Sequence, residues 1–312
     1  MIPALTASLM RRPRHHTLIF HRVVRERDVM SPNEPTAAWF DRLIAMLAKT
    51  FETISLHEAV DRASAGKLSG RTVSVTFDDG YADNYTVALP ILERHAVPAT
   101  FFVASSFLDG GRMWNDSILE TFRRLGDGKH DIDLPGVGRV ELSDDASRRA
   151  AAIQTIAAWK HLPPDQRETN VDALSQQVEA LPSDLMMTSD QLRALSASRY
   201  ATIGGHTRSH PILAAIPEAE ALQEITGGKK DLESILQEEI KLFAYPNGRS
   251  GEDYRQEHER MVGDAGFDAA VATDWGTLDA ATDLYAIPRF TPWNTKLSRF
   301  AIDLARCHYG ML

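Results

Sequence analysis

The chain has 312 residues, of which 43% are hydrophobic and 25% charged, so it can bury one large core or one core plus a subdomain. A formal net charge of −9 argues against a general nucleic-acid-binding protein, because phosphate contacts need clustered Lys and Arg. No run approaches the roughly 20 apolar residues of a membrane span, and residues 1–10 lack the basic leader of a secretory signal. The single cysteine, Cys307, is typical of a reducing compartment, so we expect a cytoplasmic protein.

Strand-like and helix-like segments alternate along most of the chain. They follow a basic run at 11–16, which we expect to be a solvated approach, with contact to a membrane-linked glycan as the alternative. Apolar, β-branched runs lie at 17–21, 71–77, 98–103, 200–204, 241–245, 268–273 and 285–290. Helical periodicity covers 36–49, 56–65, 215–237 and 297–308. This order is typical of a parallel α/β sheet.

Residues 111–190 interrupt this alternation. Helical patterns are predicted at 113–125, 144–160 and 165–181, and a loop or small hairpin at 126–142. An unstructured loop of this length is uncommon in a compact domain, so we expect a helical insertion that packs as a subdomain beside the site. It either shapes a substrate cleft as a lid or packs without a role in binding. The whole chain, 1–312, is interpreted as one domain with this insertion.

Two adjacent carboxylates end one predicted strand. Residues 74–80 read Ser-Val-Thr-Phe-Asp-Asp-Gly, and Gly80 permits a sharp turn that would leave Asp78 and Asp79 at the carboxyl end of the strand. Ligands of parallel α/β folds bind at that end. Because Asp and Gly are also ordinary turn formers, this pattern alone is weak evidence for a site.

Two histidines four residues apart follow another predicted strand. Residues 200–210 read Tyr-Ala-Thr-Ile-Gly-Gly-His-Thr-Arg-Ser-His, and either one helical turn or a tight loop would bring His206 and His210 together. Histidine pairs at this spacing are common by chance, so the agreement between two strand ends is the stronger argument. One Asp and two His are a usual zinc ligand set, which leaves the other Asp free to act as a base.

These two motifs resemble the first two signature motifs of the polysaccharide deacetylases, carbohydrate esterase family 4, which share the NodB-homology domain. The similarity extends to Tyr-Ala-Asp-Asn at 81–84, Ala-Leu-Pro-Ile-Leu at 88–92, Pro-Ala-Thr-Phe-Phe-Val at 98–103 and Phe-Ala-Tyr-Pro-Asn-Gly at 243–248. It covers roughly 15–110 and 185–292. Together with the seven predicted strands, it implies a distorted, incomplete (β/α)7 barrel with a helical insertion at about 111–190.

The resemblance also implies roles for the motif residues. In the family the first Asp of the motif is the catalytic base, and the second binds the metal together with both histidines. Asp78 is therefore the expected base, and Asp79, His206 and His210 are the expected ligands. The ion is expected to be zinc, with cobalt, nickel or iron as alternatives.

Two family motifs are altered in this chain. The third motif usually contains an Arg that is missing before Tyr245, and Arg289, at another strand end, either replaces it in orienting Asp78 or forms a plain salt bridge. The late Leu-His pair that supplies the general acid is also missing, and His308 fits this role poorly because it lies in a helical tail. Residues 17–22, Thr-Leu-Ile-Phe-His-Arg, resemble the N-terminal element of the biofilm poly-N-acetylglucosamine deacetylases, which implies that His21 is the acid.

The expected function is metal-dependent removal of an N-acetyl group from an amino sugar in a polysaccharide, oligosaccharide or glycoconjugate precursor. The Tyr245-Pro246 step is expected to contact the substrate, with a backbone amide near Tyr245 stabilising the oxyanion. Trp114 and Trp275 are candidate apolar walls for a sugar, although a buried Trp is commoner. A deacylase or deformylase of a nucleotide- or lipid-linked sugar is the first alternative, and a carbohydrate-binding protein that lost catalysis is the second. The sequence predicts no oligomeric state.

Overall fold

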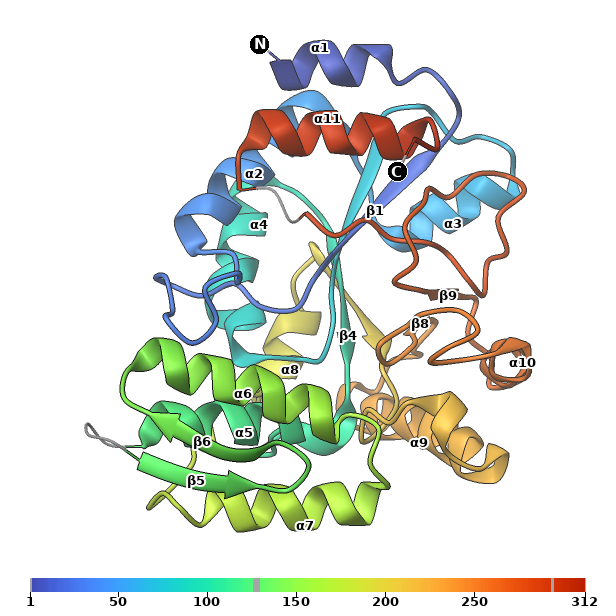
Figure 1. The fold of residues 1–312 in the computed structure, drawn as a ribbon. Coiled ribbons are helices and arrows are strands. Elements are labelled where there is room, and N and C mark those ends of the chain that lie inside the picture. Colours follow the sequence, from blue (N-terminus) through green and yellow to red (C-terminus); the bar gives the residue numbers. More distant parts are fainter. Residues whose placement is uncertain (1, 126–129, 293–294, 312) are drawn as a thin grey trace.

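The computed structural model describes residues 2–125, 130–292 and 295–311 (Figure 1). Its centre is a parallel seven-stranded sheet with the spatial order β1-β3-β4-β7-β8-β9, in which β2 pairs with β3. The strands are β1 (His15–Phe20), β2 (Glu52–Thr53), β3 (Thr72–Phe77), β4 (Ala99–Val103), β7 (Ala201–Gly205), β8 (Leu242–Ala244) and β9 (Ala269–Val271). All the predicted strands except the last are therefore confirmed, and β2 is an addition to them.

The segment 285–290, predicted as the last strand, is not a regular strand. Ile287 makes a parallel bridge to Val271 of β9, whereas Phe290 makes one to Leu18 of β1. Pro288, between them, has no N–H to donate, so the segment cannot continue a regular ladder with either neighbour. By contacting β9 first and β1 second, it joins the two edges of the sheet. The result is the predicted incomplete barrel.

Alternation along β3 separates side chains that face the outer helices from those that face into the barrel. In β3, Phe77 belongs to the core between the sheet and the helices, and Thr76 and Asp78 point to the opposite side, into the barrel. β1 pairs in register with β3, with Phe20 opposite Phe77. His21 is therefore the next position opposite Asp78, at the end of the barrel where the strands finish.

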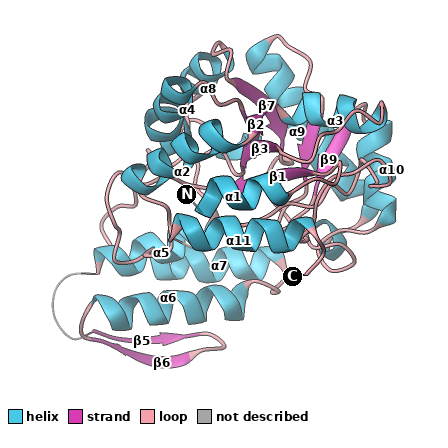
Figure 2. Ribbon diagram, turned by 90° about the horizontal axis from the view of Figure 1, so that it is seen from above, coloured by secondary structure: helices cyan, strands magenta, loops and turns pink. Residues whose placement is uncertain are grey.

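Helices cover the outside of the sheet and one of its ends. Around the sheet lie α2 (Ala37–Thr50), α3 (Leu56–Ser64), α4 (Leu89–His95), α8 (Ser189–Ser196), α9 (Glu218–Leu236) and α10 (Gln256–Asp264). Short helical turns cover Asn84–Ala88, Ser105–Phe107 and Leu213–Ala215. Helices α1 (Ile2–Leu9) and α11 (Leu297–His308) lie side by side across the end where the strands begin (Figures 1 and 2). Within the described ranges, no helix is long and apolar enough to cross a bilayer.

The insertion forms a helical subdomain at the opposite end of the barrel, where the strands finish (Figure 1). It contains α5 (Trp114–Arg124), the antiparallel hairpin of β5 (His130–Leu134) and β6 (Gly138–Leu142), α6 (Asp145–Trp159) and α7 (Pro164–Ser175). Its own apolar core includes the buried side chains of Ile118, Phe122 and Trp159. The predicted helical subdomain is confirmed, except that its last helix ends at Ser175 and not near 181.

The basic run at 11–16 is solvated only in its first half. His15 and His16 begin β1 and are fully buried, so the expected solvated approach is wrong for these two residues. His16 Nε2 lies 3.1 Å from Nδ1 of His308 in α11, and the two rings stack. Helix α11 covers this end of the strand although His308 follows His16 by 292 positions. The sequence of residues 11–16 does not indicate that a helix packs over them.

Burial keeps these three rings neutral. It lowers the pKa of His15 to about 3 and that of His308 to about 4, and the pKa of His16 also falls well below its usual value. The unfolded chain therefore binds more protons than the folded chain below pH 6.5, the ordinary histidine pKa. We expect the free energy of unfolding to fall as the pH is lowered from 6.5 towards 4.

The substitution His15→Leu is expected to reduce this pH dependence, because it removes a ring that the fold must keep uncharged. His15 alone should account for about 2 kcal/mol of the stability lost between pH 6.5 and pH 5. Urea denaturation at the two pH values measures the difference. The matched control is His57→Gln, since the His57 side chain is 40% exposed. An unchanged pH dependence in His15→Leu would mean that His15 is already charged in the folded protein.

Candidate active site

Three candidate metal ligands meet at the carboxyl ends of β3 and β7. Asp79 Oδ1 lies 3.3 Å from His206 Nε2 and 3.4 Å from His210 Nε2, and the three ligand atoms lie within 4.8 Å of one another. The histidines lie on a tight loop in which Thr207 and His210 have φ values of 62° and 57°, so the helical alternative is wrong. The Thr207 hydroxyl accepts a hydrogen bond from the His210 N–H, which stabilises that loop. The residues predicted as a metal triad are therefore adjacent in space.

The surroundings of the triad fit a divalent cation. Asp79 Oδ1 is buried without a well-aligned hydrogen-bond donor, and His206 Nδ1 donates to the Ala244 carbonyl at 2.7 Å, which leaves the Nε2 lone pair facing Asp79. Burial raises the pKa of Asp79, but His206, His21 and His210 outweigh it and hold that pKa well below its usual value. Burial lowers the pKa of His210 to about 4. Burial also lowers the pKa of His206, but Asp79 and Asp78 outweigh it and raise the net pKa, so a metal would displace a proton from this ring. An ionised carboxylate and a neutral imidazole are the states that a metal requires of its ligands.

Asp78 forms a buried, two-pronged ion pair with Arg289. Arg289 Nη1 and Nη2 each lie 2.7 Å from one carboxylate oxygen, and the two side chains are 0% and 3% exposed. The guanidinium also donates to the Ala272 carbonyl and to the Thr76 hydroxyl, at 2.7 Å and 3.1 Å. Burial raises the pKa of Asp78, but Arg289 outweighs this effect and the net pKa lies below its usual value. Asp78 is therefore an ionised carboxylate with a fixed orientation.

His21 directly follows β1 and lines the same cavity as the triad. The residues that follow the two carboxylates hold its backbone: Asn84 Nδ2 donates to the His21 carbonyl at 2.9 Å, and Asp83 accepts from the Val23 N–H at 3.2 Å. Asp83 also forms an ion pair with Arg22 at 2.8 Å. The structure thus brings the expected acid to the site, and Asp83 and Asn84 fix its position on the rim.

A buried hydrogen bond connects this region to the insertion. The Tyr81 hydroxyl donates to Oδ2 of Asp116 in α5 at 3.0 Å, and burial raises the pKa of Asp116 to about 7. The Arg22 guanidinium lies over the Tyr81 ring, 4.8 Å from its centroid. Tyr81, Asp116 and Arg22 therefore link the carboxylate loop, the insertion and the neighbour of His21. The sequence predicted no role for these three residues.

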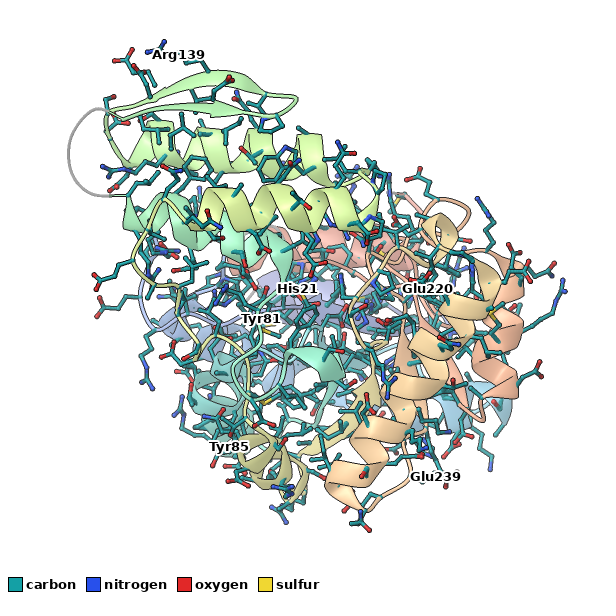
Figure 3. All side chains as sticks on the ribbon, turned by 90° about the horizontal axis from the view of Figure 1, so that it is seen from below. His21, Tyr81, Tyr85, Arg139, Glu220 and Glu239 are labelled. Atoms are coloured by element: carbon teal, nitrogen blue, oxygen red, sulfur yellow. The ribbon has the colours of Figure 1, made fainter. Side chains whose placement is uncertain are left out.

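The triad opens into a cavity of about 290 Å³ between the barrel and the insertion. The barrel lines it with His21, Asp78, Asp79, His206, His210, Ile212, Asn247 and Thr273. The insertion lines it with Met113, Trp114, Asn115, Ile156, Lys160 and Arg167. In Figure 3, His21 and Tyr81 lie near the middle of the molecule, and Arg139 lies on the outer hairpin of the insertion. Trp114 therefore lines the cavity, its contact with a sugar stays a prediction, and the insertion shapes the cavity.

The other expected substrate residues lie outside this cavity. Tyr245 is fully buried, its ring stacks on Tyr254 with centroids 3.8 Å apart, and its amide donates to the Val271 carbonyl. Neither the Tyr245 ring nor its amide is free for a substrate, so that expectation is wrong. Pro246 is buried beside it.

Trp275 likewise does not reach the cavity, because it packs on Phe290 at the surface and is 47% exposed. The cavity is lined instead by Asn247, two residues after Tyr245, and by Thr273, two residues before Trp275. Asn247 has a φ of 59°, in a turn that reverses the chain after β8. The Asn-Gly pair at 247–248 is the sequence signal for that turn.

Comparison with known proteins identifies the family of the chain. A family model described as polysaccharide deacetylase matches residues 65–265. The chain belongs to the polysaccharide deacetylase family. The matched range of this deacetylase family member contains both carboxylates, both histidines and the whole insertion, whereas His21 and Arg289 lie outside it.

Two proteins of Bacillus subtilis are similar to this polysaccharide deacetylase in sequence. The peptidoglycan-N-acetylmuramic acid deacetylase PdaA is 35% identical over 80 residues, which are 25% of this chain and 30% of PdaA. YxkH is 21% identical over 223 residues, which are 72% of this chain and 52% of YxkH. The chain thus spans about half or less of the length of these relatives.

Two solved structures share the fold of this polysaccharide deacetylase. The Streptococcus pyogenes deacetylase PplD, in complex with acetate, has a TM-score of 0.59 and 18% identity, and the match covers 89% of this chain and 92% of PplD. IcaB from Ammonifex degensii has a TM-score of 0.60 and 18% identity, and the match covers 92% of this chain and 97% of IcaB. Similarity at this identity supports the fold, and it confirms the predicted incomplete barrel of the deacetylase family.

The buried pair of Asp78 and Arg289 gives a prediction for stability. Arg289→Gln is expected to lower the free energy of unfolding by about 3 to 5 kcal/mol, because the charge of Asp78 stays buried without a partner. The double variant Asp78→Asn/Arg289→Gln, which removes that charge, should recover part of the loss. Urea denaturation of wild type, the two single variants and the double variant measures the coupling. Additive losses would contradict a direct pairing of these side chains.

Proposed function

We propose that this member of the polysaccharide deacetylase family is a metal-dependent hydrolase that removes an N-acetyl group from an amino sugar. The substrate is a polysaccharide, an oligosaccharide or a glycoconjugate precursor. One observation carries the proposal: a compact Asp and two-His ligand set lies beside a second, separately oriented carboxylate, and both face one cavity. A site that only bound metal would have no use for the second carboxylate.

The ligand set defines where the substrate carbonyl is activated. Asp79, His206 and His210 would hold a divalent cation, with zinc the first candidate and cobalt, nickel or iron the alternatives. When bound there, the cation would polarise the acetamide carbonyl and make a water molecule more acidic. The hydrogen bond from His206 to Ala244 fixes the ring for this task.

The chain's own residues would move the protons. Asp78 accepts a proton from the attacking water, and Arg289 holds both carboxylate oxygens so that the carboxylate cannot turn away from the cavity. Attack at the carbonyl carbon gives a tetrahedral intermediate. His21 then donates a proton to the amide nitrogen as the carbon–nitrogen bond breaks, which releases acetate and a free amine.

Two broader expectations remain proposals. We propose a cytoplasmic location from the single cysteine.

The acyl group is proposed to be acetyl. The name of the relative PdaA, a peptidoglycan-N-acetylmuramic acid deacetylase, supports this choice. Removal of an acyl or formyl group from a nucleotide- or lipid-linked sugar is the alternative. Loss of catalysis is the less favoured alternative, because the orientation of Asp78 by Arg289 serves a reaction and not simple sugar binding.

The two neighbouring carboxylates provide a matched pair of variants for the proposed division of roles. Asp78→Asn should keep about one divalent ion per chain but lower turnover at least ~100-fold, as loss of a general base does. Asp79→Asn should instead lose the ion, as should His206→Ala. Metal content by elemental analysis and acetate release from N-acetylated sugars measure the two effects. Equal metal loss in Asp78→Asn and Asp79→Asn would contradict the assignment.

The role of His21 is tested by His21→Gln. The variant should keep the metal and the thermal stability of the wild type but lower kcat about 100-fold, because an amide nitrogen leaves poorly without a proton. The basic limb of its pH–rate profile should also disappear. His57→Gln, on the outer face of α3, is the control and should change neither quantity. A His21→Gln variant with an unchanged basic limb would leave water as the proton donor.

A further inference from the structure

The insertion presents two positive charges to the cavity. Lys160 follows the end of α6, and Arg167 lies in the first turn of α7. Both side chains are half-buried and line the same cavity as the metal triad. Within the described part of the chain, neither forms an ion pair with a carboxylate at 4.0 Å or less.

Arg167 is held in place by contacts that leave its charge unbalanced. Its Nη1 donates to the Lys160 carbonyl at 3.2 Å, and its guanidinium lies over the Trp114 ring, 5.0 Å from the centroid. Burial lowers the pKa of Arg167, and the carboxylate that opposes this shift is its chain neighbour Glu168. Arg123 of the same insertion, also partly buried, contacts the Asp28 carboxylate at 2.6 Å. A partly dehydrated guanidinium without such a partner is ready to bind an anion.

The cavity itself offers no compensating negative charge. Its two lining carboxylates are Asp78 and Asp79. Asp78 is already paired with Arg289, and Asp79 belongs to the ligand set. The insertion side of the cavity is therefore positive, in a chain whose formal net charge is −9. The hydroxyl and acetamide groups of an uncharged amino sugar do not require two such cations.

We infer that Lys160 and Arg167 form an anion subsite that binds a negatively charged substituent, a phosphate or a carboxylate, on the amino-sugar substrate. The inference rests on the proposed deacetylase function and specifies its substrate class. A guanidinium fork matches the paired oxygens of either group, and the Lys160 ammonium adds a second charge-assisted hydrogen bond. The Trp114 ring attracts the guanidinium and thereby restricts its movement at the cavity wall. The enzyme would therefore select an anionic sugar over a neutral one.

Kinetics with three matched substrates test the subsite. They are N-acetylglucosamine 1-phosphate, N-acetylmuramic acid and the neutral methyl glycoside of N-acetylglucosamine. The wild type should show at least about tenfold higher kcat/KM for one of the anionic substrates, and the one preferred distinguishes phosphate from carboxylate. Lys160→Gln and Arg167→Gln should each remove most of this preference, so that kcat/KM falls much more with the preferred anionic substrate than with the neutral one.

The control is a cation on the same insertion that does not reach the cavity. Arg139 lies on the outer hairpin with its side chain 73% exposed (Figure 3). Arg139→Gln should keep the full preference, and Arg167→Lys, which keeps the charge but loses the fork, should keep part of it. An equal loss on neutral and anionic substrates, or a wild type without preference, would overturn the inference.

If the wild type hydrolyses none of these sugars, that result counts against the proposed function. A binding measurement then tests separately whether Lys160 and Arg167 bind an anion. Inorganic pyrophosphate is titrated calorimetrically into the metal-loaded, full-length protein. Wild type and Arg139→Gln should bind it about tenfold more tightly than Lys160→Gln and Arg167→Gln. Equal binding by all four proteins would place the anion on the metal and overturn the subsite.

Discussion

Two neighbouring carboxylates, Asp78 and Asp79, are buried at the end of β3, and each negative charge must be balanced inside the barrel. Burying an unpaired carboxylate costs several kcal/mol, so the positions of the balancing groups are constrained. Arg289 balances Asp78 from the segment between β9 and β1, and His206 and His210 face Asp79 from the end of β7. Closure of the sheet therefore completes the site, because it brings these segments to the same end of the barrel.

The strand-end residues of this site could be predicted from the sequence because parallel strands all finish at the same edge. A buried β-branched run that stops at Asp78, and another that stops before His206, leave little freedom in where these side chains point. Arg289 could be proposed for the same reason, although the sequence left open whether it orients Asp78 or forms a plain salt bridge. The structure shows a bidentate contact with Asp78, and the role of Arg289 in orienting a base stays a prediction.

Other features depend on contacts between segments that are distant in the chain. His16 is buried because α11 covers it, and the polarity of its own run predicts the opposite. Tyr245 faces the outer core on the same side as Phe243, and its ring is occupied by Tyr254, a contact with a residue that lies outside the strand. The cationic wall of the insertion likewise arises from the packing of α6 and α7 near the cavity. Sequence patterns predicted α6 and α7, but they did not predict which side of each helix faces the cavity.

The most direct test of this account is a crystal structure of the metal-loaded protein, with anomalous scattering recorded at the absorption edge of the ion. The account predicts one ion bonded to Asp79, His206 Nε2 and His210 Nε2 at about 2.0 to 2.2 Å. Asp78 should remain paired with Arg289 and make no bond to the metal. An ion bonded to Asp78, or one bound only at another position, would contradict the separation of base and ligand on which the proposed chemistry depends.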